Sequence, residues 1–202
     1  MKRIAFVNTK GGVGKTTATI LTGLSLAKRG FNVLVKDADP SGGSWEWQKK
    51  ARGKGTPLPF RVETAAIGEI EELGEEEVTA GYDYILIDTP PVMQNTMGDA
   101  VENVSDVIVI VTRPGHLDSK RTRETFKSFA KARAVLINCA NIRQKTTKET
   151  INEIDAMGFP RFDTIIPERE STHRAGAGNN QVPTDSGFIE FAGELSQAVE
   201  TA

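Results

Sequence analysis

Short apolar runs alternate with longer segments of helical period along most of this chain. Runs of four to six apolar residues are typical of strands that are buried on both faces, and the segments between them have the three- and four-residue spacing of amphipathic helices. This alternation predicts βαβ units, and therefore an α/β fold with a mostly parallel twisted sheet flanked by helices. The expected strands are residues 3–8, 32–36, 84–87, 107–111, 134–138 and 164–166, with 59–63 as a weaker seventh.

Helical periodicity predicts four helices between these strands and one that closes the chain. They span residues 15–29, 67–77, 119–131, 146–157 and 186–199. Residues 168–185 lack a clear period and are predicted to form a loop. Neither an internal repeat nor a linker-like stretch interrupts the pattern, so we expect residues 1–202 to form a single domain.

The composition is that of an ordinary globular protein. The 202 residues carry 25 Lys and Arg against 27 Asp and Glu, which gives a net charge of −2. Cys139 is the only cysteine, which excludes an internal disulfide and a thiolate metal cluster and favours a reducing, cytoplasmic compartment. The apolar runs are too short for a signal peptide or a membrane span, so we expect no membrane contact.

A phosphate-binding loop is predicted at the first junction between strand and helix. There the chain reads Gly11, Gly12, Val13, Gly14, Lys15, Thr16 and Thr17. Glycines let successive backbone N–H groups turn toward a phosphate, and the start of the helix adds a partial positive charge. In this motif the lysine, Lys15, reaches the β and γ phosphates and the hydroxyl of Thr16 binds Mg²⁺. The common spacing has a glycine where this chain has Thr9, and a second lysine, Lys10, precedes the glycines.

Lys10 to Thr17 resembles the deviant Walker A box of the ParA/MinD family of P-loop ATPases. The resemblance implies a P-loop NTPase architecture, ATP and Mg²⁺ as cofactors, and hydrolysis of ATP that is slow without a partner protein. In that family the early lysine reaches across an ATP-dependent homodimer to the partner's phosphates, so Lys10 would act in trans as an arginine finger does. The alternative is a glycine-rich turn with solvated lysines, which the flanking strand and helix disfavour.

Three carboxylates follow strand ends and are expected beside this loop. Asp37 and Asp39 come after the second strand, and the resemblance assigns Asp37 to the outer shell of the metal and Asp39 to the attacking water. Asp88 ends the strand at residues 84–87, the Walker B arrangement that holds Mg²⁺ directly or through water. A polar turn after a strand is the alternative for the first two, and a strand stopped by a proline is the alternative for Asp88.

Two positions depart from the family pattern. The family usually has an apolar residue at Lys36 and a glutamine at Ser41. A lysine inside a buried strand is costly unless it is paired, so we expect an acid at a neighbouring strand end to pair with Lys36. Ser41 is expected to change how this segment meets the partner subunit.

Four further residues are assigned by resemblance. Asn138 and Pro167 occupy positions expected to contact the adenine base, with an ordinary strand-end asparagine as the alternative for Asn138. Pro114 and Asp118 are expected near the dimer face. The two histidines are too far apart to indicate a metal site.

Residues 113–148 carry ten bases and two acids, although the whole chain has a pI of about 5.8. Non-specific DNA binding is the hypothesis, and a solvated helix face is the alternative. The resemblance favours DNA, chiefly through Arg143 and Arg169. The candidate contacts are Lys120, Arg123, Lys127 and Lys131 on one predicted helix, with Arg143, Lys145, Lys148 and Arg169 after it.

Within the family, the two ends of the chain most resemble those of the short ParA-type partition ATPases. Residues 186–202 contain acids and no base, which excludes a basic membrane-binding helix of the MinD kind. The first strand begins at residue 3, which leaves no room for an N-terminal helix-turn-helix. The resemblance then implies partition or positioning of a plasmid, chromosome or protein cargo on the nucleoid, with hydrolysis stimulated by a cargo-bound or centromere-binding partner. Two alternatives stay open, a protein-binding nucleotide switch and an ATP-dependent biosynthetic enzyme, both without DNA binding.

Overall fold

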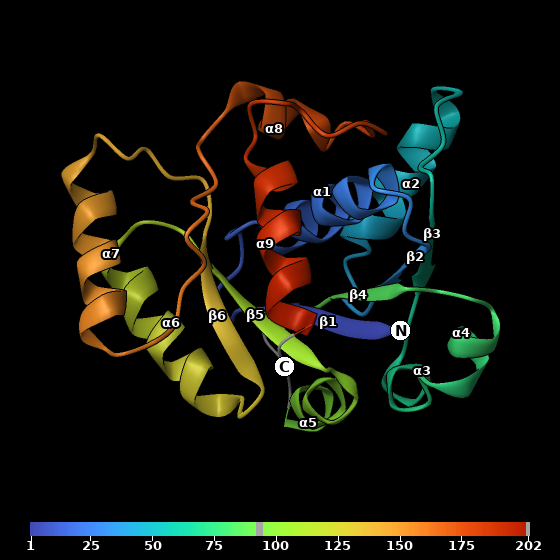
Figure 1. Ribbon diagram of the computed structural model, residues 1–202, viewed down its shortest axis with the longest axis horizontal. Coiled ribbons are helices and arrows are strands. Elements are labelled where there is room, and N and C mark those ends of the chain that lie inside the picture. Colours follow the sequence, from blue (N-terminus) through green and yellow to red (C-terminus); the bar gives the residue numbers. More distant parts are fainter. Residues whose placement is uncertain (92–94, 201–202) are drawn as a thin grey trace.

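The computed structural model describes residues 1–91 and 95–200, and within them the sheet has six strands that all run parallel. Strand β1 lies between β4 and β5 at the centre (Figure 1), which confirms the predicted α/β class and parallel sheet. The strands, in the spatial order β3-β2-β4-β1-β5-β6, are β1 (Lys2–Val7), β2 (Val33–Asp37), β3 (Arg61–Thr64), β4 (Tyr84–Asp88), β5 (Val107–Thr112) and β6 (Ala132–Ile137).

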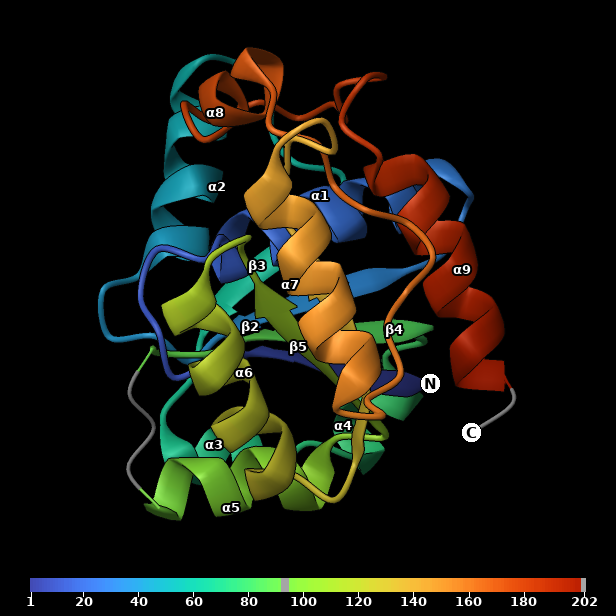
Figure 2. The same ribbon diagram turned by 90° about the vertical axis from the view of Figure 1, so that its left-hand side faces the viewer.

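Helices cover both faces of this sheet (Figures 1 and 2). Apolar residues of α1, α2 and α9 pack on one face, and those of α3, α5 and α7 pack on the other. No helix in the described part of the chain is long and apolar enough to cross a membrane. The helices are α1 (Lys15–Lys28), α2 (Gly43–Gly53), α3 (Ile67–Glu71), α4 (Glu75–Thr79), α5 (Asn95–Val104), α6 (His116–Ser128), α7 (Lys145–Ala156), α8 (Glu170–Ala175) and α9 (Phe188–Glu200).

The strand predicted at residues 164–166 is wrong, because this segment is not a strand of the sheet. The chain around it meets β6 and the residues after β6 through isolated bridges, between Val135 and Arg161 and between Ala140 and Pro167, and the N–H of Ile166 donates to the Ile137 carbonyl at 2.9 Å. Between those bridges the backbone N–H groups of residues 163 and 164 donate to the two carboxylate oxygens of Glu194 on α9, at 2.6 and 2.9 Å. The Glu194 side chain, and not a neighbouring strand, therefore accepts from these two backbone N–H groups. The weaker candidate at residues 59–63 is confirmed as β3.

Several helices differ from the predicted ones. The predicted helix over residues 67–77 is two short helices, α3 and α4, because the chain is extended at Gly74, whose N–H donates to the Glu77 carboxylate at 2.9 Å. Helices α2 and α5 were not predicted, and α8 lies within the predicted loop at residues 168–185. The predicted helix over residues 119–131 is displaced to His116–Ser128. Residues 201 and 202 of the acidic C-terminal segment lie outside the described residues.

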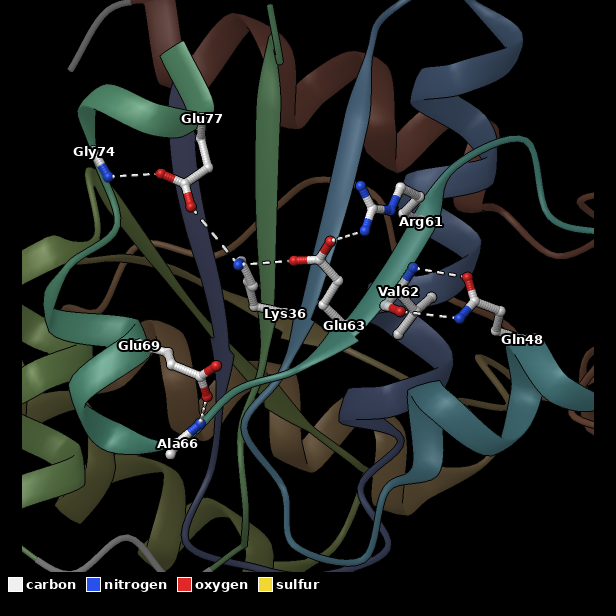
Figure 3. Close-up of polar contacts among 9 residues, drawn as sticks. All are labelled: Lys36, Gln48, Arg61, Val62, Glu63, Ala66, Glu69, Gly74 and Glu77. Carbon is white, nitrogen blue, oxygen red and sulfur yellow. Dashed lines mark hydrogen bonds and ion pairs between the residues drawn. The ribbon is translucent and has the colours of Figure 1, made fainter. Parts of the chain in front are cut away.

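Lys36 is paired as the sequence predicted (Figure 3). Its side chain is 12% exposed, and its Nζ lies 2.9 Å from Oε2 of Glu63, its register partner on β3. A second carboxylate, that of Glu77 on α4, lies 3.7 Å away. Arg61 binds the other oxygen of Glu63 at 2.7 Å. The buried charge therefore has two opposite charges beside it, which makes a lysine tolerable on this strand.

Candidate nucleotide site

The glycine-rich loop lies between β1 and α1, at the carboxyl end of the central strand. In parallel sheets this edge is where ligands collect. Gly12 and Gly14 both have positive φ, 76° and 93°, which glycine adopts without strain. The loop precedes the first turn of α1, so its backbone N–H groups and the helix N-terminus share one small region.

Two buried asparagines hold the loop. Asn8, at the end of β1, donates from Nδ2 to the Val111 carbonyl at 2.7 Å and accepts the N–H of Lys10 on Oδ1 at 2.8 Å. Asn138, which follows β6, donates from Nδ2 to the carbonyl of Val13 at 2.8 Å. The loop is thus tied to the ends of β5 and β6 before any ligand binds, and sequence reasoning missed the role of Asn8.

The position of the Asn138 side chain also requires a glycine at residue 14. A Cβ atom there would lie 2.3 Å from Nδ2 of Asn138, well inside van der Waals contact. Asn138 also accepts the N–H of Cys139 on Oδ1 at 2.9 Å. The structure thus uses this side chain to hold the loop, and its predicted adenine contact stays a prediction.

The loop lysine Lys15 is buried, with 6% of its surface exposed. Burial lowers the pKa of its ammonium group, while the nearby carboxylates of Asp88 and Asp39 raise it. A buried cation that faces carboxylates and a ring of backbone N–H groups favours an anion of high charge, such as a polyphosphate. Thr16 and Thr17, the next two residues of α1, are both partly exposed.

Asp37 and Asp88 end neighbouring strands and are register partners. Their exposed fractions are 2% and 0%. Burial and, after it, the charge of Asp37 together raise the pKa of Asp88 to about 7, against the lowering effects of the Ser44 and Thr16 hydroxyls and of the Lys15 charge. Burial also raises the pKa of Asp37, against backbone N–H donors that include Trp45 at 2.9 Å. Two buried carboxylates side by side favour a cation between them and the loop.

The residues present fit a magnesium ion. Oδ1 of Asp88 is buried and has no hydrogen-bond partner among the described residues, although the same carboxylate accepts from Ser44 through Oδ2. Within residues 1–91 and 95–200, no three His, Cys, Asp or Glu side chains are grouped as a metal cage would need. Mg²⁺ is commonly held by one or two carboxylates together with substrate phosphates and water. Asp88, Asp37 and the Thr16 hydroxyl would supply the protein's share.

Asp39 lies two residues beyond Asp37, partly exposed. Its Oδ1 accepts the N–H of Ser41 at 2.9 Å, and its own N–H donates to Oδ1 of Asp37 at 3.2 Å. These bonds form a tight turn, so the two acids occupy fixed places. This placement is compatible with the predicted division between metal and water, which remains a prediction.

Lys10 is paired with a carboxylate outside the loop. Its Nζ forms an ion pair with Oδ1 of Asp118 in the first turn of α6. The Asp118 side chain is 9% exposed and that of Lys10 is 39% exposed. Both residues were predicted to lie near a dimer face, and the structure brings them together within one chain.

A cavity of about 590 Å³ lies between the segment after β6 and the segment before α8. Pro167 lines it, as do Arg143, Arg169 and the exposed side chain of Ile142. Asn138 is not among its lining residues. The cavity is large enough for a nucleobase, which keeps Pro167 as a candidate contact for the base.

The basic residues are exposed, but they do not form the predicted stripe of four. Lys120, Arg123 and Lys127 lie on α6, whereas Lys131 lies beyond its end. Nζ of Lys131 donates to the Asn103 carbonyl at 2.9 Å, and its backbone N–H donates to Glu102 at 2.8 Å. The helix ends early because the chain becomes extended at residue 129, and Lys131 is then held against the end of α5.

The remaining basic candidates lie at the start of α7 or near α8. Lys145 pairs with Glu149 at 3.3 Å, and Arg169 lies 3.6 Å from Asp185. Arg143 and Lys148 are exposed. Helices α6 and α7 lie side by side at the β6 end of the sheet (Figures 1 and 2), and the stacked rings of Phe126 and Phe159 lie between the segments at 4.1 Å. Their cations therefore share one end of the molecule.

Comparison with known proteins gives matches over most of the chain. The family model described as the CobQ/CobB/MinD/ParA nucleotide binding domain matches residues 4–182. Maintenance of carboxysome distribution protein A from Gloeobacter kilaueensis is 30% identical over 183 residues, 85% of this chain and 79% of the relative. The chromosome-partitioning ATPase Soj of Treponema pallidum is 25% identical over 238 residues, 96% of this chain and 93% of the relative.

The fold has close counterparts among solved structures. A putative plasmid partition protein from Borrelia burgdorferi, solved with AMPPNP bound, superposes with a TM-score of 0.75. The match covers 99% of this chain and 98% of the other at 18% sequence identity. At that identity the match speaks for the architecture alone.

Proposed function

The chain belongs to the CobQ/CobB/MinD/ParA nucleotide-binding family, and we propose that it is an ATP-driven switch that positions a cargo on DNA. Its relatives include partition and positioning ATPases. In this proposal ATP with magnesium joins two copies of the chain, the dimer binds DNA without sequence preference, and a cargo-bound partner stimulates hydrolysis. The cargo class follows the relatives, which are named for carboxysome distribution and for chromosome partitioning.

One observation carries the nucleotide part of the proposal. The loop, the buried Lys15 and the carboxylates of Asp37 and Asp88 meet at the carboxyl end of the central strands, and Oδ1 of Asp88 has no hydrogen-bond partner in the part of the chain that the structure describes. Donors for phosphate and acceptors for a divalent cation thus occupy one site. A polyphosphate chelated to a metal is the ligand that satisfies both.

The residues divide the chemistry of hydrolysis between them. Lys15 and the loop N–H groups would balance the charge that builds on the β and γ phosphates, since phosphoryl transfer depends mostly on positioning and charge stabilisation. Asp39, held by the Ser41 N–H, would orient the attacking water. Thr16, Asp37 and Asp88 would hold magnesium, which would supply the positive charge that polarises the phosphate.

Dimerisation would change the partner of Lys10. Within one chain this lysine is paired with Asp118. To reach the phosphates of a second subunit it must leave that carboxylate, so the contact to Asp118 and the contact across the dimer exclude each other. Such exclusive contacts give a switch two states that a ligand can shift.

DNA binding is the part of the proposal that rests on surface charge. We call five exposed cations the basic surface, namely Lys120, Arg123 and Lys127 on α6, Arg143 before α7 and Lys148 in α7. No ion pair found within the described residues involves any of these five. A dimer would double this surface, and cations that neutralise phosphates bind DNA without reading its bases.

The deciding experiment measures binding of the full chain to non-specific duplex DNA with Mg²⁺-ATP, with Mg²⁺-ADP and without nucleotide, at two salt concentrations. We expect binding only with ATP, weakened by salt, and lost in Lys10→Ala. Lys127→Glu and Arg143→Glu should each weaken it and lower the salt dependence, by about one unit of the logarithmic slope per lost phosphate contact. Lys54→Glu is the matched control, because Lys54 is also exposed but follows α2, at the other end of the sheet.

Each other outcome supports a different function. Nucleotide-dependent dimerisation without DNA binding in any state would leave a protein-binding switch. Turnover that requires a second small molecule would favour a biosynthetic enzyme on this scaffold. DNA binding that is the same with ATP, with ADP and without nucleotide would refute the switch itself.

A further inference from the structure

Helix α2 begins against the site that would hold magnesium. The chain leaves β2 at Asp37, turns through a left-handed Gly42 and starts α2 at Gly43. A Cβ atom on Gly43 would lie 3.1 Å from Oγ1 of Thr16, so the backbone of α2 lies directly beside this threonine. The first turn of an unpredicted helix is therefore part of the wall of the site.

The next residue, Ser44, contacts the Walker B carboxylate directly. Its side chain is completely buried, and its Oγ donates to Oδ2 of Asp88 at 2.8 Å. The following N–H, that of Trp45, donates to Oδ2 of Asp37 at 2.9 Å. One turn of α2 thus holds one oxygen of each carboxylate.

The bond from Ser44 makes the two oxygens of Asp88 unequal. Oδ2 is occupied, whereas Oδ1 is buried and has no hydrogen-bond partner among the described residues. A carboxylate fixed through one oxygen cannot turn freely, and it presents the other oxygen in a constant direction. Groups that orient a metal ligand in this way strongly affect metal affinity, although they do not touch the metal.

Helix α2 is itself held firmly, so the position of Ser44 is defined. Gln48 is buried, and its amide donates to the carbonyl of Val62 on the edge strand β3 and accepts its N–H, both at 2.9 Å (Figure 3). Nε1 of Trp47 donates to the Asn179 carbonyl at 2.8 Å. The helix is tied both to the sheet and to the segment after α8, and the Ser44 hydroxyl does not have to be ordered when a ligand binds.

We propose that Ser44 is a positioning residue for the magnesium of this site, and that its hydrogen bond to Oδ2 of Asp88 selects Oδ1 as the oxygen presented to the metal or to its water. The inference rests on the proposed function, because it concerns a metal bound together with the nucleotide. It differs from the family resemblance, which assigns no role to this residue.

The test compares nucleotide affinity with and without the metal. Calorimetry of the full chain with AMPPNP, once in excess Mg²⁺ and once in EDTA, gives two dissociation constants, and their ratio measures what the metal contributes. In Ser44→Ala we expect that ratio to fall about 10- to 100-fold, as is typical when a group that orients a metal ligand is removed. The affinity in EDTA should stay as in wild type, and Ser44→Thr, which keeps the hydroxyl, should restore most of the ratio.

The control removes a buried hydroxyl that lies elsewhere. Ser25 on α1 is 2% exposed and donates to the Leu21 carbonyl at 2.8 Å, so Ser25→Ala should leave the ratio unchanged. If Ser44→Ala does not fold, Ser44→Thr and Ser44→Val carry the same comparison, since they share a shape and differ in the hydroxyl.

The possible results separate the inference from the proposed function. A ratio in Ser44→Ala within twofold of wild type, or equal ratios in the Thr and Val variants, overturns the role of Ser44 and leaves the nucleotide site intact. A loss of AMPPNP affinity in EDTA as large as the loss in Mg²⁺ overturns it as well, because the residue then supports the loop and not the metal. Wild type that binds no AMPPNP under either condition refutes the proposed function.

Discussion

Replacing Lys36 by methionine tests how much the buried charge cluster contributes to stability. Lys36 is 12% exposed and Glu77 is 11% exposed, so Lys36→Met leaves a nearly buried carboxylate without its cation. Removing one partner of a buried pair costs about 3–5 kcal/mol. Two features of the structure reduce this figure. The Nζ to Glu77 distance is 3.7 Å, and Glu63 is 30% exposed and keeps Arg61 at 2.7 Å.

We therefore expect Lys36→Met to lower the free energy of unfolding by about 2–3 kcal/mol. For a protein of this size that corresponds to a fall of about 4–12 °C in melting temperature. The assay is thermal and urea unfolding of the nucleotide-free protein at neutral pH. Lys36→Met combined with Glu77→Gln should recover more than half of the loss, because the second change removes the uncompensated charge.

The matched control is Lys49→Met on α2. Lys49 pairs with Glu46 at 2.8 Å, a distance no longer than those of Lys36, but the two side chains are 56% and 49% exposed. An exposed pair contributes little, so the control should change the unfolding free energy by less than about 0.5 kcal/mol. A Lys36→Met protein that melts within about 1 °C of the control would refute the claim that burial, not distance, sets the strength of these pairs.

Three further predictions concern the nucleotide site. Asp88→Asn should stabilise the nucleotide-free protein increasingly as the pH rises from about 4 to about 7, by up to roughly 3–4 kcal/mol. Over that range the Asp88 carboxyl ionises in the unfolded chain but stays protonated in the native protein, where its pKa is about 7, so wild type loses stability that the amide variant keeps. Urea unfolding in EDTA at pH 5 and pH 8 checks this, and a pH-independent difference would contradict it. Asp118→Asn should lower the ATP concentration needed for half-maximal dimerisation severalfold, because Lys10 then has no charged partner to leave when the dimer forms. Sedimentation measures the fraction of dimer at each ATP concentration. The double variant Lys10→Ala/Asp118→Asn should form no dimers. Asn138→Ala should weaken ATP binding about tenfold by freeing the Val13 carbonyl, and unchanged affinity in a fluorescent nucleotide titration would speak against a supporting role for this side chain.

Much of the fold was predictable because hydrophobic period reports which faces of an element are buried. The five long apolar runs all became strands, and the weak run at residues 59–63 became the edge strand β3. The run at residues 164–166 has the same local character, yet it is not a strand of the sheet. Ile166 still bonds to Ile137 at the end of β6, but Glu194, some thirty residues later, accepts from the backbone N–H groups of residues 163 and 164. The local hydrophobic pattern contains no information about a hydrogen bond from the side chain of a helix that is distant in the sequence.

The candidate site divides in the same way. Residues 10–17 are contiguous, so the loop could be recognised in the sequence, and strand ends predicted Asp37 and Asp88. Their adjacency depends on the register of β2 with β4. The pairing expected for Lys36 also follows from strand order, and the structure adds Glu77 from α4, which strand ends do not predict.

By itself the sequence determined the α/β class, the phosphate-binding loop and the acids that follow the strands, because each of these depends on residues close together in the chain. Tertiary structure alone decided that Ser44 holds Asp88, that Asn8 and Asn138 fix the loop, and that Lys10 is paired with Asp118. Except for the bond from the Lys10 N–H to Asn8, these contacts join residues 44 to 125 positions apart in the sequence, at places set by the order of the strands in the sheet. The physical reason is that a hydrogen bond or an ion pair needs two groups within about 3 Å, and which groups meet at that distance is fixed only when the sheet and its helices have packed.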